Sequence, residues 1–334
     1  MTDVRDVVEL TARMMEIDST SEREGQLVDW VDSVLTAAEW RVTRIPVTPG
    51  RDDVYATCAD APQVTLSTHL DTVPPFIPPR LDGDTLRGRG ACDAKGIAAA
   101  MIVAAERLRA SGFPIALLFV VGEEVTHDGA IAANRVATSS KVLINGEPTE
   151  STLAIGTKGA MRFTLRTLGQ AAHSAYPHLG RSAISDMVHL LAEMERLELP
   201  RDPELGDTTI NIGGIEGGVA DNVIAPDAEA RCMARLVTPA AELEQLLRDW
   251  VGQRAQFERS ITVELARLGT VSGFPTSVAA YATDIPKLTN WGKPYLFGPG
   301  SIHVAHTPDE YIDIAELRAS VDAYERITRQ LLAS

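Results

Sequence analysis

The hydrophobic pattern of the chain contains four runs of strand length that each lead into polar residues able to bind a metal. The runs and the polar residues after them are 64–68 before His69, 115–121 before Glu123 and Glu124, 141–145 before Glu147, and 294–297 before His306. Residues 94–110 are rich in alanine, carry larger apolar residues at helical spacing, and stop at Gly112. Strands that alternate with a helix are typical of a mainly parallel sheet, so we predict an α/β domain.

The pattern changes over residues 159–269. Strands are predicted near 161–165, 208–215, 227–237 and 261–265, and helices over 182–197 and 240–254. The resulting order, β-α-β-β-α-β, is that of a ferredoxin-like unit. We therefore predict a catalytic α/β domain with a mainly parallel sheet from residues 1–158 and 270–334. Residues 159–269 would form an inserted ferredoxin-like α+β lid or dimerisation domain.

Both ends of the chain are predicted to form helices of the first domain. Residues 7–40 have helical periodicity that breaks at 18–21, where Asp, Ser and Thr side chains favour helix N-caps. Two helices are therefore expected in this stretch. A closing helix is expected near 314–332.

Composition and charge narrow the class of protein. The 334 residues are 45% hydrophobic and 23% charged, as in a folded chain long enough for two domains. The net charge of −15 leaves no basic stripe to neutralise phosphates, which argues against binding to nucleic acid or an anionic membrane. Three cysteines without CxxC spacing argue against a disulfide framework, and no signal sequence or membrane-spanning run is visible. These features favour a cytoplasmic protein.

The polar residues after the runs form a candidate metal site. In an open α/β sheet, ligands bind at the carboxyl ends of the strands, so these side chains should converge in one crevice. Imidazole and carboxylate groups together suit two divalent cations, Zn²⁺ in particular, and the same set also serves Co²⁺ or Mn²⁺. Asp93 lies in the glycine-rich turn 88–93 and is the expected bridge, because glycine lets this backbone approach the metals closely. The predicted metal ligands are His69, Asp93, Glu124, Glu147 and His306.

Two further residues have expected catalytic roles. Asp71 follows His69 on an extended segment and can accept a hydrogen bond from the imidazole, which fixes its tautomer. Adjacent Glu123 and Glu124 point different ways from a strand end, so one can bind metal while the other faces the water that the metals activate. We predict that Glu123 is the general base, which takes the proton of this water and then protonates the leaving amine of an amide.

Each of these motifs alone has a simpler reading. A lone His-x-Asp is more often a surface or capping pair, adjacent glutamates are common on solvated faces, and Glu147 could merely begin a turn. The prediction depends on the joint pattern of four strand ends, suitable ligand types and the glycine-rich Asp93 turn. Isolated histidines are more often structural or exposed than ligands, and four stay unassigned: His127, His178, His189 and His303.

At these residues, nearly the whole chain resembles one family of co-catalytic zinc amidohydrolases and peptidases. Its members include acetylornithine deacetylase, succinyl-diaminopimelate desuccinylase, aminoacylase and carboxypeptidase G. The matching segments are 67–74, 88–96, 123–124, 147–149, 298–300 and 305–310. The resemblance implies the roles chosen above, namely His69, Glu124, Glu147 and His306 as terminal ligands, Asp93 as bridge, Glu123 as base and Asp71 as orienting group.

The resemblance extends to the inserted domain. Residues 169–174 are similar to the family's lid motif, whose histidine stabilises the tetrahedral oxyanion, in several members from the neighbouring subunit. This implies such a role for His173 and a homodimer through the inserted domain. Asn222, together with Arg231 or Arg235, resembles the family's contacts to a substrate carboxylate, and Gly300 is a further candidate contact. An exposed strand arginine paired with Glu229 is the competing explanation.

Two features depart from the family pattern, namely Ser182 in place of a common Asn and the sequence at 125–128. Among branches, the short chain and the spacing of Arg231 and Arg235 look most like the small-substrate deacetylases of arginine or lysine biosynthesis. The resemblance thus implies hydrolysis of an N-acyl amino acid such as acetylornithine, acetyllysine or succinyl-diaminopimelate. One alternative is a dipeptidase or carboxypeptidase with the same mechanism, and another is a non-catalytic metal-containing binding protein.

Overall fold

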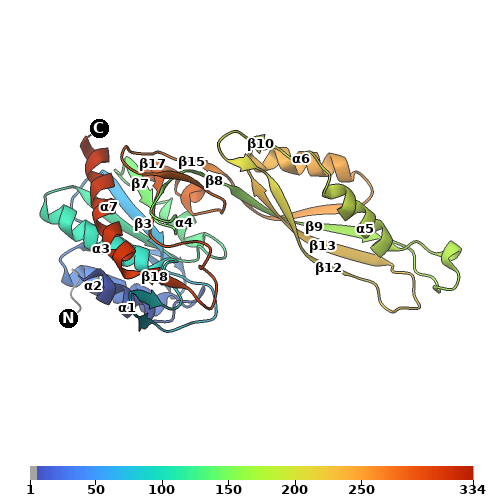
Figure 1. Cartoon of the computed structure of the whole chain (residues 1–334), viewed down its shortest axis with the longest axis horizontal. Coiled ribbons are helices and arrows are strands. Elements are labelled where there is room, and N and C mark those ends of the chain that lie inside the picture. The colour runs from blue at the N-terminus through green and yellow to red at the C-terminus, as the bar shows by residue number, and fades with distance from the viewer. Residues whose placement is uncertain (1–5, 334) are drawn as a thin grey trace. The chain divides into compact units, whose positions relative to one another are not determined.

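Figure 1 shows the chain as a computed structural model, which describes residues 6–333. Residues 1–5 and 334 of the predicted catalytic domain lie outside this range. The chain forms two compact units, the first made of residues up to Ile155, Arg267–Ser277 and Thr283 onward, the second of Gly156–Ala266 and Val278–Ala282. The second unit thus begins before 159 and takes in a segment expected in the catalytic domain. Within the second unit, the Lys158 amide donates a 2.9 Å hydrogen bond to the Ala279 carbonyl, which ties the segment Val278–Ala282 to this unit.

A six-stranded sheet forms the centre of the first unit. Its strands, in spatial order, are β1 (Arg41–Thr48), β2 (Arg51–Thr57), β6 (Ile115–Val120), β3 (Val64–His69), β7 (Val142–Asn145) and β17 (Lys293–Leu296). β3 runs parallel to both β6 and β7, and β17 runs parallel to β7. The β1–β2 hairpin adds an antiparallel edge that we did not predict. The mainly parallel sheet is confirmed, and it brings the ends of β3, β6 and β7 to one edge.

Helices cover both faces of this sheet. They are α1 (Val7–Met15), α2 (Gly25–Ala37), α3 (Lys95–Ala110), α4 (Asp128–Ala133) and α7 (Ile314–Ala333). Leu117 and Phe119 of β6 belong to the core under α3, while Leu118 and Val120 belong to the core under α4. A strand buried on both faces needs apolar residues at every position, which explains the unbroken run at 115–121.

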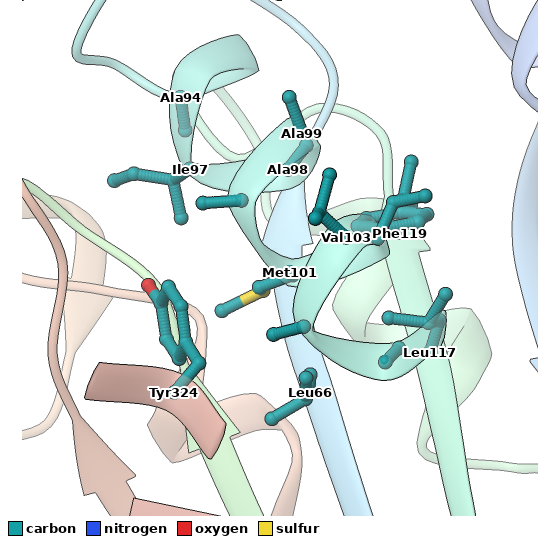
Figure 2. Close-up of a cluster of buried hydrophobic side chains, with 14 of the residues drawn as sticks. Leu66, Ala94, Ile97, Ala98, Ala99, Met101, Val103, Leu117, Phe119 and Tyr324 are labelled. Carbon is teal, nitrogen blue, oxygen red and sulfur yellow. The ribbon is translucent and has the colours of Figure 1, made fainter. Parts of the chain in front are cut away.

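Helix α3 is buried nearly all round. Figure 2 shows Ile97, Met101 and Val103 of this helix between Leu66 of β3, Phe119 of β6 and the ring of Tyr324 from α7. The Tyr324 hydroxyl donates a 2.8 Å hydrogen bond to the Phe297 carbonyl at the end of β17, so the buried ring leaves no polar atom without a partner. This packing fixes the start of α3, and therefore the turn that carries Asp93.

The second unit has the predicted ferredoxin-like order. Its elements are β9 (Gly159–Leu168), α5 (Ala183–Met194), β12 (Thr209–Gly217), β13 (Asp227–Leu236), α6 (Ala240–Val251) and β14 (Gln256–Val263), with the antiparallel sheet order β12-β13-β9-β14. Alternate residues of β9, such as Met161, Phe163 and Leu165, form a separate core with α5 and α6. The inserted ferredoxin-like fold is confirmed.

Several short elements complete the fold. They are β4 (Arg80–Asp82), β5 (Thr85–Arg87), β8 (Leu153–Thr157), β10 (Arg201–Asp202), β11 (Gly206–Asp207), β15 (Ala266–Arg267), β16 (Thr276–Ala279), β18 (Tyr311–Asp313) and the 3₁₀ turns Pro177–Leu179, Ile285–Lys287 and Thr289–Trp291. The three cysteines are free thiols. Within residues 6–333, no helix is long and apolar enough to cross a membrane.

Candidate metal centre

The predicted ligands of the first unit converge at the edge where the parallel strands end. His69 is the last residue of β3, Glu124 follows β6, and Glu147 follows β7. Asp93 lies just before α3, and His306 lies in the loop between β17 and β18. The structure brings the imidazoles and carboxylates of all five residues into one cluster.

His69 faces two carboxylates with the same ring nitrogen. Its Nε2 lies 3.0 Å from Asp93 Oδ1 and 3.9 Å from Glu147 Oε2, while its Nδ1 lies 2.9 Å from the main-chain oxygen of Asp71. A carbonyl oxygen only accepts, so Nδ1 carries the proton that it donates there. The lone pair on Nε2 would then point at two anions, an arrangement that a second ring proton or a bound cation makes favourable.

His306 makes the matching contacts on the other side of Asp93. Its Nε2 lies 3.2 Å from Asp93 Oδ2 and 3.0 Å from Glu124 Oε1. The two oxygens of Asp93 therefore face different histidines, as the predicted bridging role requires. His69, Asp93 and Glu124 also each offer a ligand atom within 4.8 Å of the others.

The charge balance of the cluster fits a cation. Burial raises the pKa of Glu147 well above its usual value, and neighbouring Asp93 raises it further. Hydrogen bonds that His306 donates to Asp93 and Glu124 raise the pKa of His306 to about 10. Glu147 Oε1 is buried and has no hydrogen-bond partner among the described residues. Bound divalent cations would supply the missing partner and the missing positive charge, and this donor set suits them.

Glu123 lies beside this cluster without joining it. Gly122, just after the end of β6, has a φ of 73°, and a Cβ atom there would collide with the Asp128 and Arg51 side chains, so the turn that presents Glu123 requires glycine. Burial raises the pKa of Glu123 well above the usual value for a carboxyl, and Glu147 raises it further. A raised pKa makes the carboxylate a better proton acceptor, as a general base requires.

Asp71 differs from its expected geometry. We predicted that its carboxylate accepts the hydrogen bond from His69, but the close partner at 2.9 Å is the Asp71 main-chain oxygen, and Oδ1 lies at 3.5 Å. The Asp71 carboxylate instead accepts hydrogen bonds from the backbone amides of Glu123 and Glu124, at 3.0 and 3.1 Å, and from the Ser21 hydroxyl at 3.0 Å. It thus links the end of β3 to the turn after β6.

Glu310 holds the Asp93 turn in a similar way. Its Oε1 accepts hydrogen bonds from the backbone amides of Gly90, Cys92 and Asp93, at 2.9, 3.3 and 3.2 Å, and its Oε2 pairs with Arg89 at 2.6 Å. Glu310 and Arg89 are each 1% exposed. In the sequence, Arg89 and Glu310 stand out only as members of the matching segments. A linear pattern does not show that the Glu310 carboxylate accepts hydrogen bonds from amides more than 200 positions away.

Comparison with known proteins identifies the family. Residues 155–258 match the M20 peptidase dimerisation domain. A peptidase M20 domain-containing protein of Schizosaccharomyces pombe is 37% identical over 336 aligned positions, covering 96% of this chain and 84% of the relative. A probable carboxypeptidase of Aspergillus terreus is 36% identical over 364 positions, covering 94% of this chain and 84% of the relative. The chain belongs to the M20 peptidase family.

Solved structures share the fold of this M20 chain. A tripeptidase from Staphylococcus aureus superposes with a TM-score of 0.81 at 19% identity, covering 98% of this chain and all of that one. A dinuclear metal-binding M20 peptidase from Bacillus subtilis gives 0.71 at 15% identity, covering 98% of each chain. The two-domain architecture is therefore that of the M20 peptidases. As a member of this family, the chain is a metallohydrolase, which confirms the predicted enzyme class.

The predicted lid histidine of this M20 chain is exposed on a turn of the second unit. The Ala175 amide donates a 3.1 Å hydrogen bond to His173 Nδ1, so the ring proton of the neutral form lies on Nε2. The Ser174 amide donates to the Asn222 carbonyl at 2.9 Å, so the turn that carries His173 lies beside Asn222, the predicted contact to the substrate carboxylate. His173 therefore presents a hydrogen-bond donor.

The two candidate arginines on β13 differ in their partners. Arg231 pairs with Glu216 on β12 at 2.9 Å, whereas Glu229, the partner we considered, pairs with Arg166 at 2.8 Å. Arg235 is half-buried, and no carboxylate of residues 6–333 pairs with it. Arg231 is thus already neutralised, while Arg235 retains an unpaired positive charge.

Gly300 has a structural reason to be glycine. Its φ of 83° favours glycine, and a Cβ atom there would lie 2.5 Å from the Cβ of Cys92. Its amide donates to Glu316 Oε1 at 3.0 Å, and its carbonyl accepts from the Glu150 amide at 2.8 Å. Both polar groups have partners within the fold, so the predicted substrate contact at Gly300 gains no support from the geometry.

We predict that Glu310→Gln weakens metal binding by about 10- to 100-fold, the usual effect of losing a residue that orients a metal ligand. The substitution removes the negative charge that holds Arg89 and the three amides of the Asp93 turn. Metal affinity would be measured by competition with a chelator, with circular dichroism as the test of folding. Glu229→Gln, which changes an ion pair of the second unit, is the matched control, and equal affinity in both variants would contradict the anchoring role.

Proposed function

We propose that this M20 metallohydrolase is an exopeptidase of the carboxypeptidase type, which hydrolyses the peptide bond before a free terminal carboxylate. The observation that carries the proposal is the buried imidazole and carboxylate cluster with Glu123 beside it. The preference for peptides over the N-acyl amino acids that we first expected comes from the A. terreus relative, which is named a probable carboxypeptidase. Both substrate classes present the same amide and the same free carboxylate.

Two divalent cations fit the cluster, one among His69, Asp93 and Glu147 and the other among His306, Asp93 and Glu124. When bound, they would polarise the scissile carbonyl and acidify the attacking water. Zn²⁺ suits this mixture of nitrogen and oxygen donors, and Co²⁺ would be accepted by the same set. The short contacts of both histidines to Asp93 support this division of the ligands.

Glu123 is the proposed general base and then the general acid. Its backbone amide donates to the Asp71 carboxylate at 3.0 Å, and its side chain is 11% exposed, so the turn that carries Glu123 is held in place and the carboxylate is largely shielded from bulk water. One of its oxygens would take a proton from the attacking water and release it to the nitrogen of the leaving amine. The raised pKa supports this exchange, because it favours uptake of the proton by the Glu123 carboxylate.

Two residues of the second unit are proposed to act on the substrate. His173 would donate its Nε2 proton to the oxyanion that forms as the carbonyl is attacked. Arg235 would pair with the terminal carboxylate, which a guanidinium matches in charge and in fork geometry, and Asn222 would add an amide contact. The unpaired charge of Arg235 supports its selection over Arg231.

We also propose a homodimer through the second unit, in line with its match to a dimerisation domain. Exposed apolar side chains occur on α5 and at the end of the edge strand β12, where Val188 is 53% and Ile215 is 53% exposed. Exposed apolar groups on a helix and an unpaired strand edge are features that association can cover. The molar mass in solution measures this state directly.

Release of amines or amino acids from a substrate panel tests the proposed function. Metal-stripped protein would be assayed with and without added Zn²⁺ or Co²⁺ on dipeptides, longer peptides with free or amidated carboxyl ends, and N-acetyl and N-succinyl amino acids. We expect metal-dependent release of the last residue from free-carboxyl peptides. Release only from N-acyl amino acids would move the function to deacylase, and silence with metal bound would favour a binding protein.

We expect Glu123→Gln to lower kcat by roughly 10²- to 10⁴-fold, the usual contribution of general acid–base catalysis. Glutamine has nearly the same shape but cannot take up the proton of the attacking water. Steady-state kinetics would be compared with metal content at the five-residue cluster, which should stay at the wild-type level. Undiminished turnover in this variant would rule out Glu123 as the base.

Arg235→Ala should raise KM for free-carboxyl peptides by roughly 10- to 100-fold, because a hydrogen bond to a charged group contributes about 1.5–3 kcal/mol. It should change KM for the amidated peptides far less. Arg231→Ala is the matched control, since that arginine lies on the same strand but is paired with Glu216. If both variants raise KM equally, carboxylate recognition is not specific to Arg235.

A further inference from the structure

A second group of potential metal ligands lies next to the main cluster. It consists of Glu123, His127 and Asp284, whose ligand atoms all lie within 4.8 Å of one another. His127 was left unassigned in the sequence, and neither it nor Asp284 has a part in the proposed reaction. All three belong to the first unit, and their side chains are 11%, 12% and 2% exposed.

The contacts of His127 repeat those of His69. His127 Nδ1 lies 2.8 Å from Asp284 Oδ1 and 3.9 Å from Glu123 Oε1. His69 Nε2 lies 3.0 and 3.9 Å from two carboxylate oxygens of the main cluster. In a tetrahedral zinc site with bonds of about 2.0–2.1 Å, neighbouring ligand atoms are roughly 3.3 Å apart. For each histidine, one carboxylate oxygen lies closer than this spacing and the other lies farther away. Small side-chain shifts would therefore accommodate a cation.

The surrounding charges also favour a cation. Asp53 is fully buried nearby, and its Oδ2 has no hydrogen-bond partner among the described residues. Its pKa is raised by burial first and then by the charges of Asp284 and Asp128. The neighbouring guanidinium of Arg51 is already engaged, because it pairs with Glu24 at 2.9 Å and with Asp128 at 2.8 Å. The acids around His127 thus outnumber the free positive charges.

We propose that Glu123, His127 and Asp284 form a third cation site, which takes Zn²⁺ when the metal is in excess. The site offers one imidazole nitrogen and two carboxylates, leaving room in the coordination sphere for water, as zinc commonly accepts. Occupation would engage the Glu123 carboxylate as a ligand and so withdraw it from proton transfer. This second consequence rests on the proposed role of Glu123, whereas the binding of the cation does not.

The competing explanation is that His127 and Asp284 form only an ion pair. Zinc stoichiometry separates the two, measured by equilibrium dialysis of the full chain against buffered Zn²⁺ and elemental analysis of the protein. His127→Asn suits the test, because residue 127 has a left-handed backbone at φ 55°, which asparagine tolerates. Asp284→Asn is a second variant, and His189→Asn, at an exposed position of α5, is the matched control.

We expect the wild type and His189→Asn to bind one more zinc ion per chain at saturation than His127→Asn and Asp284→Asn. This difference tests the third site whatever number of ions the main cluster holds. A negative result would therefore count against the third site and not against the proposed function. Equal stoichiometry in all four proteins, with folding checked by circular dichroism, would overturn the site. The His127–Asp284 contact would then be an ion pair alone.

The second arm measures inhibition. For each protein, the hydrolysis rate at excess zinc is divided by its own rate at zinc just sufficient for the main cluster. We expect this ratio to fall at least several-fold in the wild type and in His189→Asn, and to stay closer to one in His127→Asn. A third ion that binds without lowering the ratio would retain the cation site but contradict its effect on Glu123.

Discussion

Mutual repulsion among buried carboxylates is the constraint on which the candidate site depends. Asp93, Glu123, Glu124 and Glu147 lie close together in a region with little access to water, and burial together with neighbouring acids raises the pKa of three of them. Such a cluster is unfavourable unless positive charge balances it. The fold holds the groups in place through parallel strands whose ends meet at one edge, and the two histidines are the positive partners that the chain itself supplies.

Two further carboxylates hold the backbone of the site in place by accepting hydrogen bonds from its amides. Asp71 accepts the amides of Glu123 and Glu124, and Glu310 accepts three amides of the Asp93 turn. Carboxylates that accept several amides hold a turn more firmly than neutral acceptors, because each hydrogen bond is charge-assisted. The loops that carry the base and the bridging aspartate are therefore fixed through their backbone amides.

The sequence predicts the parallel strands, the inserted ferredoxin-like fold and the convergence of His69, Asp93, Glu124, Glu147 and His306, because burial on both faces and strand-end chemistry leave local patterns. It misses the β1–β2 hairpin, whose mixed polar residues lie at a sheet edge and need no hydrophobic run. It also misses the Glu310 anchor and the His127–Asp284 pair, which join residues 157 or more positions apart. The sequence also did not separate the two substrate classes, because peptides and N-acyl amino acids need the same residues around the scissile amide. We therefore first expected N-acyl amino acids and now propose peptides.

The two halves of the centre differ in their access to solvent. The His69 side chain is 1% exposed at the end of a central strand, whereas the His306 side chain is 48% exposed in a loop, with a left-handed φ of 64°. An ion beside His306 would exchange with solution by displacement of one accessible ligand, but an ion beside His69 would have to leave through the buried carboxylates. The centre would therefore empty in a fixed order, and a half-loaded state that retains the inner ion would persist during depletion.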